Sequence, residues 1–176
     1  MSSHSHSDLI SIAAKWVKNH LGCGAVVTEL CGGRSLYGEI PDVIGWNGHR
    51  SFTVECKISR ADFLADLKKP FRVKPAHGMG LLRFYLTPKG LLKKEDVAAS
   101  GWGLLEVGEK RVQSIAPSHV FQRSLKAENM LMYTALQRVQ FRITQPLHKM
   151  VAWDAQGKTF PLVQPEQDVT EHYEYL

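Results

Sequence analysis

The fold is decided by residues 39–57, Glu-Ile-Pro-Asp-Val-Ile-Gly-Trp-Asn-Gly-His-Arg-Ser-Phe-Thr-Val-Glu-Cys-Lys. Two apolar runs flank the dipeptide Asn47-Gly48, and such a dipeptide between hydrophobic runs is the strongest short-range signal for a β-hairpin. A two-residue type I′ turn at this dipeptide pairs Trp46 with His49. The stretch therefore predicts an antiparallel pair of strands.

The predicted pairing also assigns each side chain to a face, because the period along a strand is two. Asp42 then lies opposite Thr53, and Asp42, Glu55 and Lys57 project from one face. Asp42 and Glu55 become diagonal neighbours, about 6–8 Å apart at Cβ. The other face is apolar and consists of Val43, Gly45, Phe52, Val54 and Cys56. A slip by one residue would move Asp42 to that apolar face.

Two carboxylates at this separation can share one divalent cation. Mg²⁺ prefers a few carboxylates, several waters and the phosphate oxygens of a substrate. Such an ion polarises a phosphodiester and supplies a metal-bound hydroxide. Lys57 would orient or deprotonate the attacking water, or neutralise the developing charge. The alternative interpretation is a surface hairpin whose charged side chains point into water.

The residues before the hairpin indicate a helix and a strand. Apolar residues at helical spacing predict a helix over residues 8–21, capped by Ser7, after a flexible end at residues 1–7. The β-branched residues 25–30 predict a strand. Residues 31–38 contain three glycines and form a loop into the hairpin.

The residues after the hairpin predict a helix that starts directly behind Lys57. Ser59 followed by Asp62 is a capping signature, and Pro70 ends the segment. Asp62 and Asp66 lie four residues apart on one face, where two like charges repel unless a cation lies nearby.

The motif Pro41-Asp42 with Glu55-Cys56-Lys57 resembles that of the PD-(D/E)XK nuclease superfamily. The following residues narrow the resemblance to its MmcB-like branch, which is associated with DNA repair; they are Ser59, Asp62-Phe63, Asp66 and Lys68. The resemblance covers about residues 9–115 and departs from the pattern at residues 73–80. It implies an α/β, restriction-endonuclease-like core, a mixed central sheet flanked by helices, with a C-terminal helical extension.

The resemblance also implies an activity and a set of roles. The reaction would be hydrolysis of DNA phosphodiester bonds with Mg²⁺ or Mn²⁺. Asp42 and Glu55 would ligate the metal, and Lys57 would position the nucleophile. Glu29 is the candidate for a further metal-binding carboxylate, with Glu39 behind it. A double-strand cut by one site per chain would require a homodimer.

A basic stretch follows the motif. Residues 67–94 contain no Asp or Glu but eight of the 22 Lys and Arg residues of a chain with a net charge of +5. We predict a phosphate-binding surface here, and the alternative is an ordinary solvated face. Its predicted DNA contacts are Lys68, Lys69, Arg72 and Lys74, together with Arg34 from the preceding loop. The sequence His77-Gly-Met-Gly within it predicts a mobile loop, a flap over bound nucleic acid.

The remaining segments complete an α/β pattern. The sequence predicts a central strand at 81–86, a helix at 91–98, strands at 103–107 and 111–115, a helix at 118–142, a hairpin at 151–162 and an acidic tail from 165. In the long helix, the stripe expected to face the core is Leu125, Met132, Leu136 and Val139. The expected divisions are a core over 8–117, a C-terminal part over 118–164 and the tail.

Composition limits the number of domains, the cellular compartment and the class of protein. A chain of 176 residues with 44% hydrophobic residues can form one folded domain. Three cysteines without Cys-x-x-Cys spacing favour a reducing cytosol over disulfides or a zinc site. No membrane span or signal peptide is expected. The first rival to a nuclease is a non-catalytic nucleic-acid-binding module on the same fold, and the second is a protein-interaction adaptor.

Overall fold

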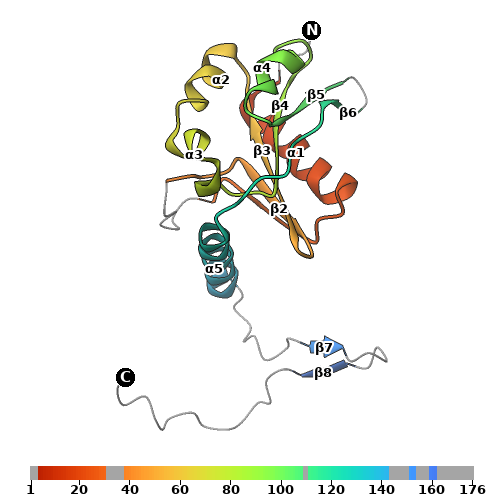
Figure 1. Cartoon of the computed structure of the whole chain (residues 1–176). Helices are drawn as coiled ribbons and strands as arrows, with labels where there is room; N and C mark the ends of the chain where they lie inside the picture. Colours follow the sequence, from red (N-terminus) through yellow and green to blue (C-terminus); the bar gives the residue numbers. More distant parts are fainter. Residues whose placement is uncertain (1–3, 31–37, 109–110, 143–150, 154–158, 162–176) are drawn as a thin grey trace. The chain divides into compact units, whose positions relative to one another are not determined.

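The computed structural model describes residues 4–30, 38–108, 111–142, 151–153 and 159–161 (Figure 1). It divides the chain into two compact units, Met1–Ala135 and Leu136–Leu176. The first unit contains the predicted motif, so it is described first.

The first unit is built on one six-stranded sheet in which the strand order follows the chain order. The strands are β1 (Ala25–Thr28), β2 (Val43–Asn47), β3 (Arg50–Cys56), β4 (Leu82–Pro88), β5 (Gly103–Val107) and β6 (Val112–Ala116). Strands β3, β4 and β5 run parallel, and the other neighbouring pairs are antiparallel. The predicted mixed central sheet is therefore confirmed.

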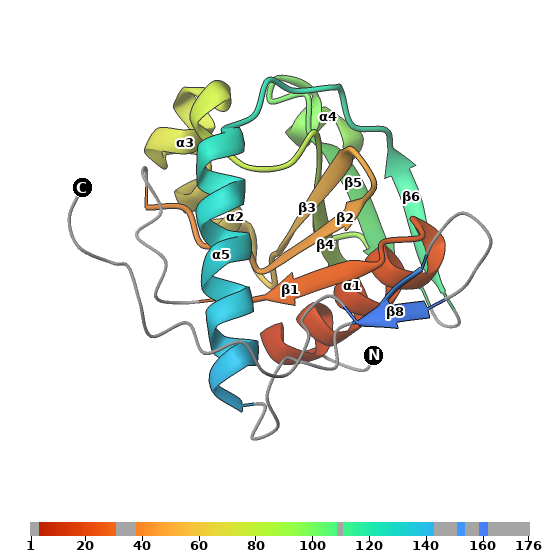
Figure 2. The ribbon, with the colours of Figure 1, turned by 90° about the horizontal axis from the view of Figure 1, so that it is seen from below.

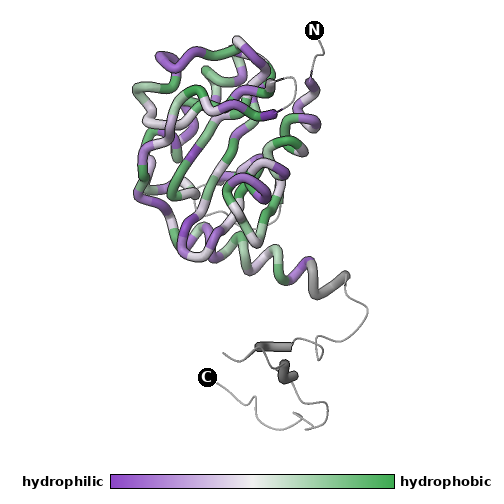
Figure 3. Tube along the Cα trace, turned by 90° about the vertical axis from the view of Figure 1, so that its right-hand side faces the viewer, coloured by the Kyte–Doolittle hydropathy of each residue, from purple (hydrophilic) through white to green (hydrophobic). Residues whose placement is uncertain are grey.

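Helices cover both faces of this sheet (Figures 1 and 2). They are α1 (His6–His20), α2 (Arg60–Asp66), α3 (Pro70–Val73), the 3₁₀ turn η1 (Pro75–His77), α4 (Lys94–Ala98) and α5 (Leu125–Arg142). Helix α1 packs on the predicted apolar face of the hairpin, where Val17 meets Val43 and Val54 in one core cluster. Residues of α2, α4 and the start of α5 pack on the opposite face. Figure 3 shows hydrophobic and hydrophilic residues alternating along α1, as expected of a helix that buries one side.

Helix α1 begins earlier than the sequence predicts. Its N-cap is Ser5, not Ser7, and Ser5 and Asp8 form a capping box in which the Asp8 amide donates to Ser5 Oγ at 3.2 Å. His6 therefore belongs to the helix rather than to a flexible end.

The hairpin register differs from the predicted one, yet the faces are as predicted. Asn47 lies opposite Arg50, so Gly48 and His49 form the turn. Gly48 has a φ of 57° and His49 has no positive φ, which matches a turn with glycine at its first central position. Asn47 is held in the strand because its side-chain amide donates to the carbonyl of Leu21 at 2.9 Å.

The register places the two predicted metal ligands directly opposite each other. Val43 pairs with Val54, and the next step along the two chains puts Asp42 opposite Glu55 instead of Thr53. This shift changes the partner by two residues, and a shift by an even number leaves every side chain on its face. On the apolar face, position 45 must be glycine, because a Cβ there would overlap the side chains of Val17 and Cys23.

The segment between α3 and β4 is not a mobile flap, so that prediction is wrong. The buried guanidinium of Arg83 donates to three carbonyls of the segment, those of Gly80 at 2.9 Å, Pro75 at 2.8 Å and Gly78 at 3.1 Å. Met79 is buried in a core cluster. The loop is thus fixed from inside.

Helix α5 starts at Leu125 rather than at residue 118, and its buried face is not the predicted stripe. Ala127, Glu128 and Leu131 are buried, whereas Leu125 is exposed and Leu136 is 69% exposed. The side chain of Val139 lies outside the described residues. The rotation follows from Glu128, whose carboxylate accepts from Ser51 Oγ at 2.8 Å.

In the second unit, β7 (Val151–Trp153) and β8 (Thr159–Pro161) form an antiparallel pair, which confirms the hairpin predicted at 151–162. The acidic tail from residue 165 lies outside the described residues. Among the helices that the structure describes, none has the length and apolar content needed to cross a bilayer.

Candidate active site at the end of strand β3

Glu55 and Lys57 meet where strand β3 ends. The backbone amide of Lys57 continues the ladder to β4 by donating to the Leu86 carbonyl at 3.0 Å. Lys57 Nζ lies 3.4 Å from Glu55 Oε2 and 3.3 Å from Asp66 Oδ1. The side chains of Glu55 and Lys57 are only 3% and 5% exposed. The predicted Glu-x-Lys pair and the first helix behind it therefore form one buried cluster.

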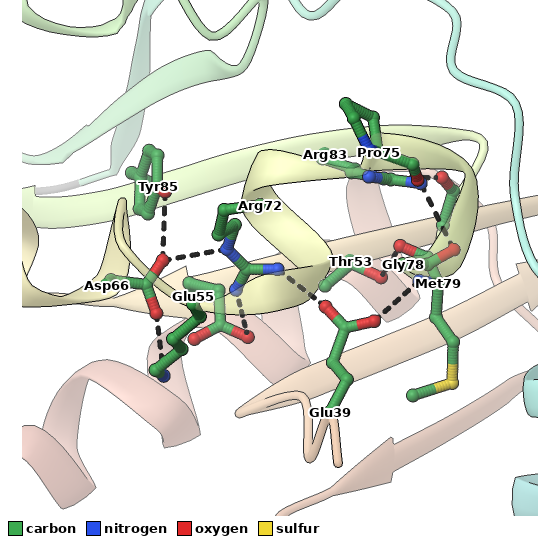
Figure 4. Close-up of polar contacts among 12 residues, drawn as sticks. Glu39, Thr53, Glu55, Asp66, Arg72, Pro75, Gly78, Met79, Arg83 and Tyr85 are labelled. Carbon is green, nitrogen blue, oxygen red and sulfur yellow. Dashed lines mark hydrogen bonds and ion pairs between the residues drawn. The ribbon is translucent and has the colours of Figure 1, made fainter. Parts of the chain in front are cut away.

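The guanidinium of Arg72, on α3, lies at the centre of this cluster (Figure 4). Its Nη1 is 2.6 Å from Glu39 Oε1, its Nη2 is 3.1 Å from Glu55 Oε1, and its Nε donates to Asp66 Oδ2 at 2.8 Å. The side chain of Arg72 is 3% exposed. Arg72 thus joins three carboxylates, and it does not lie on the surface where we predicted a DNA contact.

Asp66 receives hydrogen bonds from several sides. Tyr85 Oη donates to Asp66 Oδ2 at 2.9 Å, and Lys69 Nζ lies 2.7 Å from Asp66 Oδ1. Burial alone would raise the pKa of Asp66, but Arg72, Lys57 and Lys69 hold it well below the ordinary value of 3.8. Asp66 therefore stays charged. The repulsion expected between Asp62 and Asp66 is relieved by a nearby cation, since Lys57 Nζ lies close to both carboxylates.

Glu55 behaves differently from Asp66. Burial raises the pKa of Glu55 from 4.5 to about 7; Arg72 and Lys57 lower it, whereas Asp42 raises it further. For Lys57, burial lowers the pKa, but Glu55 and Asp66 outweigh burial and the net direction is upward. Lys57 therefore keeps its proton, and this arrangement favours the orienting and charge-neutralising roles over proton abstraction.

Asp42 lies beside this cluster at the start of β2. Its Oδ2 accepts from the amide of Cys56 at 2.7 Å and lies 3.4 Å from Nε2 of His6 on α1. The Asp42 side chain is 16% exposed, so it is the more accessible of the two predicted metal ligands.

The other predicted site residues lie at varying distances from the cluster. Glu29 follows β1 with a φ of 41° and is exposed; its amide donates to the Asp42 carbonyl at 3.1 Å. Glu39, the second choice, is buried in the cluster instead, where its Oε2 accepts from the Met79 amide at 2.6 Å. Arg34 lies outside the described residues. Lys68, Lys69 and Lys74 are exposed, as predicted.

The residues suit a magnesium site in type and register. Two carboxylates at neighbouring strand positions, Asp42 and Glu55, are the kind of protein ligand that Mg²⁺ ordinarily takes, with waters and phosphate oxygens as the rest. Among the described residues, no group of three or more His, Cys, Asp or Glu side chains is arranged to hold a metal. Any divalent cation bound here would thus depend on Asp42 and Glu55. In this structure, the carboxylate of Glu55 forms ion pairs with Lys57 and Arg72.

Sequence reasoning missed Tyr85 and His6. A signal existed for Tyr85, because polar groups recur at every second position of β4, at Arg83, Tyr85 and Thr87, on an otherwise apolar strand. No local pattern distinguished His6, whose contact with Asp42 depends on how α1 packs on the sheet.

Comparison with known proteins adds information on the fold. None of the protein-family models matches the chain, and no curated protein matches it with significance. Among solved structures, the SPO1766 protein of unknown function from Silicibacter pomeroyi is similar, with a TM-score of 0.57 and 20% sequence identity. The match covers 85% of this chain and 100% of that chain. At this identity the similarity shows the fold alone.

Proposed function

We propose that this protein is a metal-dependent nuclease of the PD-(D/E)XK type, with a restriction-endonuclease-like core, that hydrolyses phosphodiester bonds of DNA. One observation carries the proposal: the register of β2 and β3, continued one step beyond the pair Val43–Val54, brings Asp42 to Glu55, and Lys57 Nζ lies 3.4 Å from Glu55 Oε2. This pair belongs to an antiparallel meander that follows α1 and precedes a crossover to the parallel strand β4. The motif residues on this meander are those on which the resemblance to the MmcB-like branch rests.

Each residue of the cluster has a role in this proposal. Asp42 and Glu55 would hold Mg²⁺ or Mn²⁺, which when bound polarises the phosphate and lowers the pKa of a bound water. Lys57, kept protonated by its carboxylate neighbours, would neutralise charge that develops on the phosphate. Asp66 holds the Lys57 ammonium in place and is itself held by Tyr85. Arg72 keeps Glu55 aligned with the strand end.

A second candidate is a non-catalytic nucleic-acid-binding module. It is favoured by the pairing of the carboxylates: Glu55, Asp66 and Glu39 each form an ion pair with buried Arg72, as in a purely structural network. Such a module would keep the binding surface and would have no metal dependence.

A cleavage assay separates the two candidates. Labelled duplex, single-stranded and branched DNA, and RNA, are incubated with the protein in Mg²⁺, in Mn²⁺ and in EDTA. We expect cleavage only with metal, and Asp42→Asn should abolish it. Absence of cleavage on the whole panel, or equal cleavage by Asp42→Asn, would leave the binding module as the better account.

The role of Lys57 gives a sharper test with a matched control. Lys57→Met should lower turnover by about 10²–10⁴-fold, because the charge that stabilises the transition state is lost. Lys126→Met removes an exposed lysine on α5 that belongs to neither the cluster nor the predicted DNA contacts, and it should keep turnover within a few-fold of wild type. Calorimetric titration with Mn²⁺ should give similar affinities for both variants. Loss of Mn²⁺ binding in Lys57→Met would assign Lys57 a structural role instead.

A further inference from the structure

A groove runs along α1 on the face of the sheet opposite to the Glu55 cluster. It has a volume of about 490 Å³ and lies between α1 and the ends of β5 and β6. The side chains that give it its chemical character are His4, Lys15, Trp16, Asn19, His20 and Arg111. Its volume is within the range of sites that bind small molecules, roughly 300–1,000 Å³.

The groove is electropositive. Lys15 and Arg111 are exposed cations on its two sides, and His4 and His20 add imidazoles. The described residues that line it include no carboxylate. A lining of this composition attracts an anion, and phosphate is an anion that both lysine and arginine bind by charge-assisted hydrogen bonds.

The groove also has a prepared aromatic surface. The Trp16 indole is half-buried, and its edge-to-face contact with Phe84, at a centroid distance of 5.6 Å and 74°, anchors it to the core. The exposed His20 ring stacks on Trp16, with centroids 5.3 Å apart and planes at 21°. An aromatic platform among cations is the usual combination in sites for unpaired nucleotides, because bases stack on the rings while cations pair with the phosphates.

The groove begins next to the candidate active site. His4, which precedes α1, lines it, and Nε2 of His6, in the first turn of α1, lies 3.4 Å from Asp42 Oδ2. A chain bound along α1 toward its N-terminus would therefore reach Asp42 at the end of the sheet where β2 begins, and it would have to pass around that end to meet Glu55 and Lys57 on the opposite face.

We propose that this groove binds an unpaired nucleotide segment, with a base on the Trp16–His20 stack and phosphates on Lys15 and Arg111. The inference deepens the proposed function, on which its meaning for catalysis rests: the substrate would carry a single strand beside the scissile bond. Duplex DNA does not suit the groove, because a paired base cannot leave its stack to reach an aromatic platform without the cost of flipping.

The test measures binding without metal, by fluorescence anisotropy of a labelled deoxythymidine decamer in EDTA. Lys15→Glu should weaken binding about tenfold or more. Lys18→Glu makes the same charge change on the same helix outside the groove, and it should stay within about twofold of wild type. Lys15→Ser with Arg111→Ser should flatten the salt dependence by about 1.4 log units per log unit, at 0.7 per phosphate for single strands. Equal effects of Lys15→Glu and Lys18→Glu would overturn the inference.

A second arm tests stacking and the size of the ligand. His20→Ala, at an exposed position, should weaken decamer binding several-fold without unfolding the chain. The NMR signal of the Trp16 indole N–H, assigned with Trp16→Phe, should shift with the decamer and much less with thymidine monophosphate at equal nucleotide concentration. Equal shifts with both ligands, or equally tight binding of a blunt duplex, would overturn the assignment to an unpaired strand.

The nuclease proposal and the groove proposal can be disproved independently of each other. Groove variants that bind like wild type, beside an Asp42→Asn variant that has lost cleavage, overturn the groove and leave the nuclease standing. Loss of decamer binding in groove variants, in a protein that cleaves nothing on the panel, overturns the nuclease and leaves the nucleotide site standing.

Discussion

Glu55 is a carboxylate that the fold removes from water and places between two cations. Lys57 and Arg72 attract its charge, but burial and the neighbouring carboxylates act in the opposite direction, and the balance raises its pKa to about 7. The ion pairs therefore do not fully offset the loss of hydration, as is common for buried charges. A group balanced in this way changes its charge near neutral pH.

The pKa of Glu55 predicts a pH dependence of stability in EDTA. Its pKa in the folded chain, about 7, lies above the ordinary 4.5, so the folded state binds the proton more tightly than the unfolded state. The free energy of unfolding should therefore fall as the pH rises from about 4.5 through about 7. Glu55→Gln should lack this component, so its stability relative to wild type should increase between about pH 5 and pH 8. Urea unfolding at several pH values measures the difference.

The control for this prediction is Glu95→Gln, which removes an exposed carboxyl on α4. Its stability should remain parallel to that of wild type over the same pH range. If Glu55→Gln is also parallel to wild type, Glu55 is ionised throughout and its cations dominate.

At the residue scale, the sequence could predict that Asp42, Glu55 and Lys57 lie near one another, but not how their charges are paired. Asp42, Glu55 and Lys57 follow from the period of a strand, which is local information. Arg72 was assigned to the surface because it belongs to a run of basic residues. Its contact with Glu39 joins residues 33 positions apart and depends on the packing of α3, which no spacing in the sequence reveals.

At the scale of elements, the hairpin shows which predictions still hold when the pairing of two strands shifts. The turn was predicted at Asn47-Gly48, but the bond from Asn47 to the Leu21 carbonyl, a tertiary contact, keeps Asn47 in the strand. The partner of Asp42 changed and its face did not. Predictions that depend on faces survive such shifts by two residues, whereas predictions of the opposite residue do not.

Helix α5 contacts the sheet through the buried carboxylate of Glu128, beside the apolar contacts of Ala127 and Leu131. Glu128 accepts from Ser51 Oγ at 2.8 Å, from the Gly80 amide at 2.9 Å and from Trp46 Nε1 at 3.2 Å. Hydrogen bonds of this kind have no hydrophobic period, and for that reason the apolar stripe of the helix was a poor guide to its orientation.

Glu128→Ala should therefore destabilise the first unit strongly. The substitution leaves several buried donors without an acceptor, and each costs about 1–3 kcal/mol, so a loss of about 3–5 kcal/mol is expected. Urea unfolding measures it. Asn129→Ala, at the next and exposed position of the same helix, should change the free energy of unfolding by less than about 0.5 kcal/mol. Similar effects of the two substitutions would mean that water replaces the lost acceptor.

At the scale of the whole molecule, the basic stretch separates into two populations. Arg72 and Arg83 are inside, where they bind carboxylates and carbonyls, and the lysines are outside. Among these lysines, Lys69 contacts Asp66 of the candidate site, and Lys68 and Lys74 lie near it in the chain. A surface for the duplex part of a substrate would consist of these three.

The triple variant Lys68→Ser, Lys69→Ser and Lys74→Ser should flatten the salt dependence of duplex DNA binding by about 2–3 log units per log unit. The reason is the release of about 0.9 counterion per neutralised phosphate. Fluorescence anisotropy at several salt concentrations in EDTA measures the slope. The triple Ser variant of Lys89, Lys93 and Lys94 removes the same charge from another exposed part of the stretch, and its slope should change less. An unchanged slope in the first variant would mean that these lysines are only a solvated face.

The overall layout of the first unit could be predicted because its elements are defined locally. Alternation marked the hairpin and helical spacing marked α1, while an apolar run marked β4 as central. The ends of α1 and α5 were misplaced, because a cap at Ser5 competes with one at Ser7 and because residues 118–124 bond to other parts of the chain, as when the His119 amide donates to the Gly101 carbonyl at 2.8 Å.

The strand order of the sheet has a consequence for synthesis. Each strand pairs only with the strands before and after it in the chain, so no early strand waits for a late one to insert between its neighbours. As the polypeptide leaves the ribosome, each new strand would therefore pair with the strand made just before it. Pairing between neighbours in the chain closes shorter segments than pairing between distant ones would, which favours rapid folding, while the parallel pairs β3–β4 and β4–β5 still require crossovers.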